Sequence, residues 1–341
     1  MMALSTSVSQ AAAPPYRDQE RNLVATLMRS QYLETQDVSP EAILELTRAA
    51  FPNLPNRELG FAYYATAHAV LLINDLDLAT HRYSASLFEI ATLHYGSAMA
   101  GSESMFIRSL ITIIRRGPCT QDERSAAIQR ISNLLTELEL FSLRLPIPIL
   151  QVAHDWKLLA ESLEFIAEVE KKNDEASSAR WKAEYQRAAS LYEIELQRLP
   201  GPDSTFSIKR GEILLNLGYC QYKSGNPGVT NTRLALEQFL GCKSPKHIVY
   251  AFKLLSDAYL SAANARLAYK CALSAVSIYE ANKNLAHKAD VTHAIQQSSK
   301  VEKSAFGRNG LTGMVLESND PLILARDFLE FTHKSKDKHQ V

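Results

Sequence analysis

Two similar helix–turn–helix patterns follow one another between residues 208 and 281. In the first, apolar residues recur every three to four positions over 208–224 and 229–242, and the turn between them contains Gly225. In the second, the same spacing covers 246–262 and 264–281. A period of 3.6 residues predicts amphipathic helices. Two consecutive helix pairs of similar length indicate that the chain repeats one structural unit.

The rest of the chain shows the same periodicity, interrupted by glycine and proline. Further helices are predicted at 17–34, 39–50, 57–74, 77–96, 103–116, 121–142, 149–172, 175–198, 285–302 and 320–333. No segment shows the strict alternation of apolar and polar residues that is typical of half-buried strands. The pattern therefore predicts an all-α fold of about fourteen helices.

Breaks in the pattern divide the chain into four regions. Residues 1–15 are rich in Ala, Ser and Pro and are predicted to be a disordered tail, with a targeting or export segment as the alternative. Residues 16–199 form an N-terminal helical-repeat region. Residues 208–303 hold the two helix pairs above and a capping helix. Residues 304–341 comprise a loop, a short helix and a charged tail.

The residues at 214–242 resemble the tetratricopeptide repeat. The first helix of that repeat has a large residue, Leu-Gly, an aromatic residue and a glycine at the turn, here Leu214, Leu217, Gly218, Tyr222 and Gly225. Its second helix has small, large and small residues, here Ala235, Phe239 and Cys242. The next pair matches at Leu255, Tyr259, Ala263, Ala268, Ala272 and Ala275.

The resemblance is weaker outside 208–281. The pair at 57–96 matches more loosely, the pair at 103–142 lacks the Leu-Gly, and the turn predicted over 226–234 is longer than that of the family. What the resemblance implies is a right-handed superhelical solenoid of antiparallel helix pairs. Gly218 and Ala235 are then the points of closest contact between helices.

Members of this family bind an extended or helical peptide on the concave face of the solenoid, which the first helices line. The resemblance places on that face Tyr64, His68, Glu212, Leu215, Tyr219, Tyr222, Lys253 and Asp257. Ordinary packing between helices is the alternative role for each of them. Members that bind chaperone tails hold the terminal carboxylate with Lys and Asn, and only Lys253 fits this pattern. We therefore expect no chaperone tail, but an apolar or amphipathic segment of another protein.

Composition restricts the other classes of partner. Lys plus Arg and Asp plus Glu are both 37, so the net charge is zero, whereas nucleic-acid-binding and polybasic membrane-surface proteins carry a basic excess. No apolar run reaches the roughly 18 residues that a transmembrane helix needs. The four cysteines are scattered, without a C-x-x-C, which favours buried thiols in a reducing compartment. The expected location is the cytoplasm or the nucleus, and not the secretory route.

No strong catalytic motif is present. Glycine-rich nucleotide loops, the H-E-x-x-H zinc motif and the G-x-S-x-G elbow are absent from the sequence. His154-Asp155, together with His94 and Asp203, matches the ligand types of an HD-type phosphohydrolase, but the spacing is not diagnostic. A transcriptional regulator with a repeat sensor domain is a further alternative, with residues 36–50 as half of a helix-turn-helix. The favoured prediction is a non-catalytic adaptor or complex subunit that needs no cofactor or metal.

Overall fold

The computed structural model describes residues 56–73, 78–95, 100–117, 120–144, 149–170, 175–199, 207–281, 318 and 320–337. Every regular element in these segments is an α-helix. The predicted all-α class is therefore confirmed for the part of the chain that is described. The chain divides into two compact units, Met1–Leu138 and Glu139–Val341.

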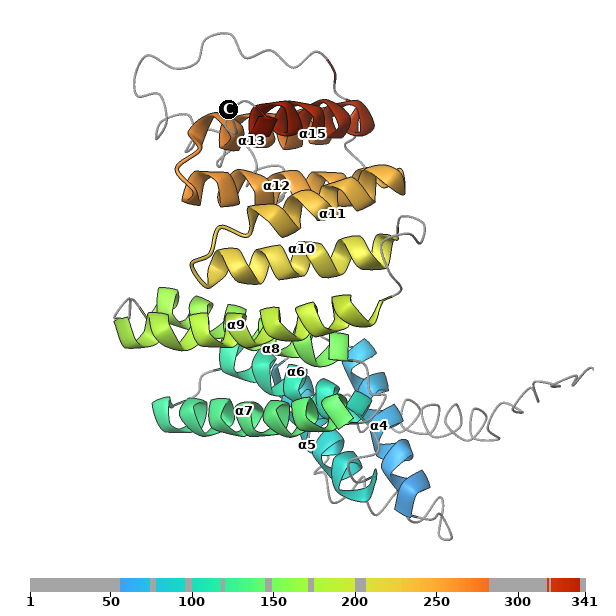
Figure 1. Ribbon diagram of the computed structural model, residues 1–341. Coiled ribbons are helices and arrows are strands. Elements are labelled where there is room, and N and C mark those ends of the chain that lie inside the picture. Colours follow the sequence, from blue (N-terminus) through green and yellow to red (C-terminus); the bar gives the residue numbers. More distant parts are fainter. Residues whose placement is uncertain are drawn as a thin grey trace, which may run out of the picture. The chain divides into compact units, whose positions relative to one another are not determined.

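The first unit contains α4 (Asn56–Ile73), α5 (Leu78–Tyr95), α6 (Ala100–Arg116) and most of α7 (Gln121–Arg144) (Figure 1). Consecutive helices α4, α5 and α6 pack against one another around a core that includes Tyr63, Ala67 and Phe88. The hydroxyl of Ser84 in α5 donates to the carbonyl of Ala67 in α4 at 3.2 Å. Small residues thus bring these two helices close together.

A capping box starts α7. The Thr120 hydroxyl accepts from the backbone N–H of Glu123, and the Glu123 carboxylate accepts from the backbone N–H and the hydroxyl of Thr120. This reciprocal arrangement satisfies two donors at the helix start. The backbone hydrogen bond from Thr120 is the main cause that lowers the pKa of Glu123.

The second unit contains the end of α7, then α8 (Ile149–Val169), α9 (Glu175–Arg198), α10 (Ile208–Lys223), α11 (Val229–Gly241), α12 (Pro245–Ser261), α13 (Ala265–Ala281) and α15 (Pro321–Asp337). Helices α8 and α9, α10 and α11, and α12 and α13 pack as pairs, and α10 and α12 each also pack on the second helix of the preceding pair. Figure 1 shows α9 to α13 as successive layers whose directions alternate.

Most predicted helix boundaries agree with the structure to within a few residues. Eleven helices are described. The predicted helices 17–34, 39–50 and 285–302 and the tail 1–15 lie outside the described residues, as does the predicted loop 305–318 apart from residue 318. The long turn predicted over 226–234 is wrong, because α11 already begins at Val229. Gly228 reverses the chain with a φ of 67°, a conformation that glycine adopts without a steric penalty.

Three successive helices, α10, α11 and α12, end in the same way. The residue after each helix cap has a positive φ: 102° at Gly225, 51° at Lys243 and 57° at Ala263. The next N–H then returns to a carbonyl five residues earlier, as from Asn264 to Tyr259 at 2.8 Å. These are Schellman motifs, which satisfy the last carbonyls of a helix. The same C-terminal geometry thus ends three successive helices.

We expect Ala263→Gly to stabilise the second unit by about 1 kcal/mol, because a left-handed conformation costs an alanine roughly 1–2 kcal/mol relative to glycine. Gly225→Ala, at the equivalent position, is the matched control, and a Cβ there meets no atom within 4 Å. Its effect should have the opposite sign. Urea denaturation of both variants measures the difference. If Ala263→Gly destabilised the unit, the left-handed conformation assigned to Ala263 would be wrong.

The two helices of the α10–α11 pair touch through glycines. A Cβ at Gly218 would lie 2.3 Å from Oγ1 of Thr232, and one at Gly228 would lie 2.1 Å from the carbonyl oxygen of Gly218. A Cβ at Gly211 would likewise lie 2.4 Å from the ring of Phe239. Gly218 is therefore a point of close contact, as predicted, and the atoms nearest to its added Cβ belong to Thr232 and Gly228.

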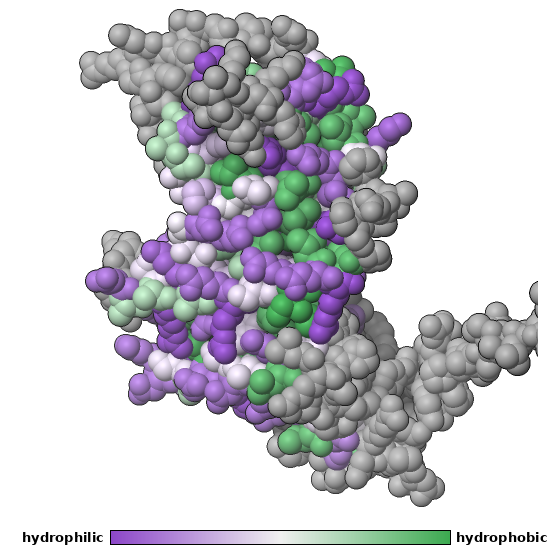
Figure 2. Space-filling model, in the orientation of Figure 1, coloured by the Kyte–Doolittle hydropathy of each residue, from purple (hydrophilic) through white to green (hydrophobic). Residues whose placement is uncertain are grey.

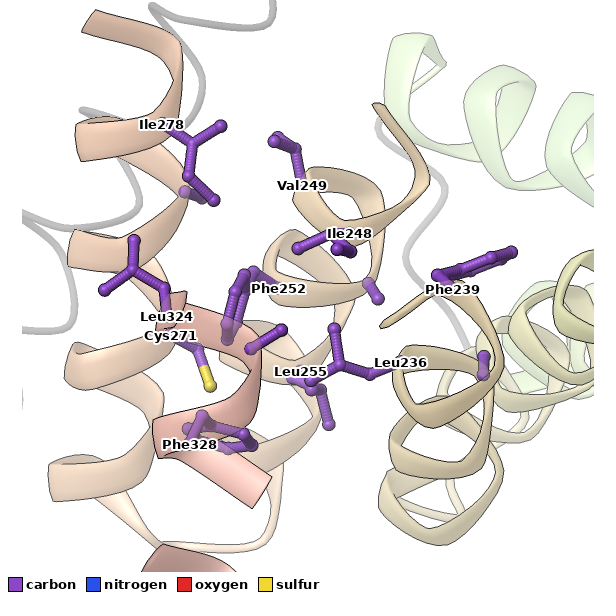
Figure 3. Close-up of a cluster of buried hydrophobic side chains, with 14 of the residues drawn as sticks. Leu236, Phe239, Ile248, Val249, Phe252, Leu255, Cys271, Ile278, Leu324 and Phe328 are labelled. Atoms are coloured by element: carbon purple, nitrogen blue, oxygen red, sulfur yellow. The ribbon is translucent and has the colours of Figure 1, made fainter. Parts of the chain in front are cut away.

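A continuous apolar core joins α10 to α15. Phe239 of α11, Phe252 of α12 and Phe328 of α15 are fully buried in it (Figure 3). Two free thiols, those of Cys220 and Cys271, are also buried, and burial raises the pKa of the Cys220 thiol to about 12. The prediction of buried thiols is confirmed for these two cysteines, whereas Cys242 is only half-buried and Cys119 lies outside the described residues.

Candidate functional site

The eight predicted groove residues belong to both units. Tyr64 and His68 lie on α4 in the first unit, and the other six lie on α10 and α12 in the second. The Tyr64 ring is tilted against Phe88 of α5, with centroids 5.7 Å apart, and lies 6.2 Å from His68. These contacts give Tyr64 a place in the packing between α4 and α5, which is the alternative role considered for it.

Tyr219 is at the centre of the contacts in the second unit. Its ring lies 4.8 Å from Nζ of Lys157 in α8 and 5.8 Å from Nζ of Lys223, and it packs edge-on against Tyr185 of α9. Burial is the main cause that raises the pKa of the Tyr219 hydroxyl. Two lysines over one aromatic ring hold it electrostatically and sterically.

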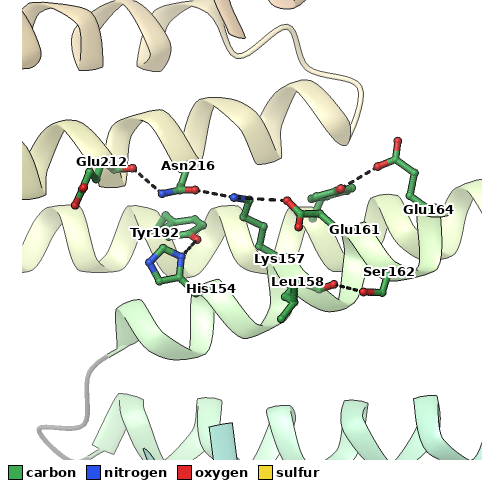
Figure 4. Close-up of polar contacts among 10 residues, drawn as sticks. His154, Lys157, Leu158, Glu161, Ser162, Glu164, Tyr192, Glu212 and Asn216 are labelled. Carbon is green, nitrogen blue, oxygen red and sulfur yellow. Dashed lines mark hydrogen bonds and ion pairs between the residues drawn. The ribbon is translucent and has the colours of Figure 1, made fainter. Parts of the chain in front are cut away.

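Polar contacts join α8 to α10 beside this ring (Figure 4). Lys157 Nζ donates to Oδ1 of Asn216 at 2.9 Å and lies 3.6 Å from the carboxylate of Glu161. The Asn216 amide in turn donates to the backbone carbonyl of Glu212 at 2.9 Å. Each of these side chains therefore has a fixed partner.

Glu164 connects three helices. Its carboxylate accepts from Nζ of Lys223 in α10 at 2.7 Å and from the hydroxyl of Tyr185 in α9 at 2.9 Å. The side chain of Glu164 is 18% exposed and that of Lys223 is 26% exposed. A partly buried ion pair with an additional hydrogen bond orients its members more firmly than an exposed pair does.

His247 connects the first turn of α12 to α10. Its Nε2 lies 3.2 Å from the Glu212 carboxylate, its Nδ1 lies 2.6 Å from the Ser244 hydroxyl, and its ring stacks on Phe239 with centroids 4.9 Å apart. Further along α12, Lys253 Nζ lies 5.8 Å from the ring of Tyr250. Each of the neighbouring first helices is thus linked to the next by side chains.

We call this set the α8–α10–α12 face. It consists of Lys157, Glu161, Glu164, Glu212, Asn216, Tyr219, Tyr222, Lys223, His247, Tyr250, Lys253 and Asp257. Of the predicted residues, Leu215 is partly buried and packs against the apolar core. Burial, followed by the charge of Asp257, raises the pKa of Tyr222.

The contribution of α8 to this face was not predicted. Lys157, Glu161 and Glu164 are spaced by four and three residues, so they share one side of the helix. That spacing was visible in the sequence. It was not assigned because α8 lacks the residues of the repeat pattern that identified α10 and α12 as first helices.

The structure describes three of the four HD-type candidates, His154, Asp155 and His94. Nδ1 of His154 lies 2.6 Å from the hydroxyl of Tyr192, while Asp155 is buried and accepts from the amide of Gln151 at 3.2 Å. His94 stacks on Tyr63 in the first unit, and Asp203 lies outside the described residues. Within the described segments, no group of three or more His, Cys, Asp or Glu side chains is arranged to hold a metal ion.

Hydrophobic side chains also reach the surface of the second unit. Figure 2 shows them over α11, whereas α9 is mostly hydrophilic in that view. Large apolar residues that are more than a third exposed include Ile208, Leu234, Ile323 and Phe331. Single exposed apolar residues are common on protein surfaces, so these positions alone do not define a site. Among the helices that are described, none has the length and hydropathy needed to cross a bilayer.

Comparisons of the chain with protein-family models, with curated proteins and with solved structures found no match.

The half-buried carboxylate of Glu184 on α9 gives a pH-dependent prediction. Burial, reinforced by Glu139, raises the pKa of Glu184, although Arg187 and Arg180 oppose the shift. A raised pKa means that the folded state binds the proton more tightly, so stability falls as pH rises above the ordinary value of 4.5.

Glu184→Gln should therefore raise the free energy of unfolding at pH 7 by about 0.5 kcal/mol, allowing for solvent screening, and have no effect near pH 4. Glu193→Gln, an exposed position on the same helix, is the control. Urea midpoints measured between pH 4 and pH 8 test this. A gain for Glu184→Gln that is constant across this range would show that the carboxylate charge is not its cause.

Proposed function

We propose that the protein is a non-catalytic adaptor or complex subunit of the cytoplasm or nucleus. Its second unit is a tetratricopeptide-like, right-handed solenoid that binds a segment of another protein on the α8–α10–α12 face. The paired helices α8 to α13 and the Schellman motifs that end α10, α11 and α12 support the solenoid. The face is formed by the first helix of each pair, as the resemblance implies.

The observation that carries the proposal is the fixed position of Tyr219. Lys157 and Lys223 approach its ring, and Glu164 holds Lys223 and Tyr185 in place. Side chains that are already oriented lose less conformational entropy when a partner binds. Tyrosine also offers an apolar ring and a polar tip, which suits it to protein interfaces.

The chemistry of the face favours an amphipathic helix as the partner segment. Tyrosine rings provide apolar contact, and charges of both signs lie beside them. A terminal carboxylate fits less well, because Lys157 is already engaged by Asn216 and lies beside the negative charge of Glu161. We therefore propose that the face binds no chaperone tail. Because the net charge of the chain is zero, we also propose no nucleic-acid partner.

The test is a quantitative comparison of co-purifying proteins by mass spectrometry. We expect at least one protein bound by the wild-type chain to decrease about 10-fold or more with Tyr219→Ala/Lys253→Ala, as for loss of an interface hot spot. Gln186→Ala/Gln197→Ala, two exposed positions on α9, is the matched control and should retain that protein.

The identified partner segment is then titrated as a synthetic peptide against both variants by calorimetry. Circular dichroism confirms that both variants remain helical. If every partner and the peptide bind the Tyr219→Ala/Lys253→Ala variant as they bind wild type, the face is not the binding site.

A further inference from the structure

Helix α15 lies outside the pairwise order of the second unit. It follows α13 only after residues 282–320, and it contacts α11, α12 and α13 together. In Figure 1 it lies alongside α13, at the end of the unit opposite α8 and α9. The other helices from α8 to α13 pack mainly on their neighbours in sequence. Helix α15 is therefore an addition to the paired helices and does not continue their order.

The contact is made by one apolar side of α15. Leu324, Ala325, Phe328 and Leu329 are buried in the core shared with α11, α12 and α13. Their spacing of one, three and one residues corresponds to a single stripe of a helix. The Phe328 ring is fully buried and lies edge-on to Phe252 and Tyr259 of α12, with centroid distances of 5.6 and 6.1 Å (Figure 3).

The other side of α15 is exposed and charged. Arg326, Asp327 and Glu330 are exposed, and Phe331 at the edge is covered in part by Nζ of Lys270 at 4.6 Å from its ring. Pro321 begins the helix, and the Asp320 carboxylate accepts from the N–H of Leu322 at 2.8 Å. The helix thus carries its own N-terminal cap, and apolar side chains make its contacts with the core, while Lys270 of α13 contacts Phe331 at the edge.

This is the arrangement by which an amphipathic helix binds an apolar protein surface. We infer that the α11–α13 face, centred on Phe252 and Tyr259, is a helix-binding site. In the isolated chain α15 occupies it. An amphipathic helix of a partner protein replaces α15 when it carries Leu, a small residue, Phe and Leu at the positions of Leu324, Ala325, Phe328 and Leu329.

This site is separate from the one in the proposed function. On α12, the α8–α10–α12 face uses Tyr250, Lys253 and Asp257, whereas the α15 site uses Phe252 and Tyr259. Residues two positions apart on a helix point to nearly opposite sides. The inference therefore does not rest on the proposed function, and either can fail without the other.

The experiment uses the full chain with a protease site inserted between residues 281 and 318. After cleavage, we expect the C-terminal fragment to stay with the rest of the chain in gel filtration. We also expect it to exchange with excess fluorescent peptide of residues 318–337, measured by anisotropy. Uncut wild-type chain should bind the peptide at least about 10-fold more weakly, because the tethered α15 competes at a high effective concentration.

Peptide variants test the chemistry of the partner. Phe328→Ala in the peptide should weaken binding about 30-fold or more, as for a buried aromatic anchor, and Glu330→Ala should change it less than about twofold. An alanine-based helix that carries only the Leu, Ala, Phe and Leu of the stripe should compete with the peptide, and the same composition in scrambled order should not. The Tyr219→Ala/Lys253→Ala chain should bind the peptide normally.

Three results would overturn the inference. The first is a cleaved fragment that never exchanges with the added peptide. The others are a Phe328→Ala peptide that binds as tightly as the wild-type peptide, and an uncut chain that binds the peptide as tightly as the cleaved chain does. A second measurement avoids the cleaved chain. The uncut Phe328→Ala chain should show a higher melting temperature when the wild-type peptide is added, and no rise would also overturn it.

Discussion

Phe239→Ala is expected to lower the free energy of unfolding of the second unit by about 3–5 kcal/mol, the range for large-to-small substitutions at buried aromatic residues. The ring is fully buried, stacks on His247 and fits against Gly211, where any Cβ would lie 2.4 Å from it. Its removal leaves a cavity where α10, α11 and α12 meet. Urea denaturation followed by circular dichroism measures the loss.

Phe331→Ala is the matched control, because this ring is 37% exposed on α15. Its loss should cost less than about 1 kcal/mol, mainly through the contact with Lys270. Equal effects of the two substitutions would mean that the cluster around Phe239 is not the core of the second unit.

Gly218→Ala is expected to destabilise the second unit by about 1–3 kcal/mol, the usual range for overpacking. Alanine is ordinarily the better helix former by roughly 1 kcal/mol, so the sign of this change is diagnostic. The added Cβ would lie 2.3 Å from Oγ1 of Thr232 and 3.1 Å from the backbone oxygen of Gly228. The helices α10 and α11 would have to move apart.

A double-mutant cycle with Thr232→Ala identifies the cause. Removing Oγ1 relieves the closest contact, so the double variant should be more stable than the sum of the single losses predicts, by about 0.5 kcal/mol or more. Only part of the loss is recovered, because the contact with the Gly228 backbone remains. Strict additivity would rule out a steric clash with Thr232 as the source.

Helix positions were predictable because they depend on local signals. The limits of α9, predicted at 175–198, and of α10, predicted at 208–224, agree with the structure to within one residue. Periodic apolar residues and the breaks between them carry this information. Gly218 was recognised as a contact point from its place in the repeat pattern, which is also a local signal.

The candidate site was only partly predictable. Glu212, Tyr219 and Lys253, which the repeat pattern assigned to a groove, belong to the helices α10 and α12 that contribute to the α8–α10–α12 face, and their role in binding stays a prediction. Lys157 and Glu164 were missed, because α8 shows no family signature and their partners, Asn216 and Lys223, are 59 residues away in sequence. Tyr64 packs against α5, a contact that the sequence does not distinguish from a place on a binding surface.

For the described residues, the sequence by itself determined the helical class, the helix limits and the pairing of α4 with α5, α8 with α9, α10 with α11 and α12 with α13, because each of these depends on residues close together in the chain. The pair predicted at 103–142 is wrong, because α6 packs mainly on α5. Only the tertiary structure decided which side chains meet across helices. Examples are the contact of Gly218 with Gly228, the network around Tyr219 and the attachment of α15 to α12. Such contacts depend on distances that the periodicity of a single helix does not contain.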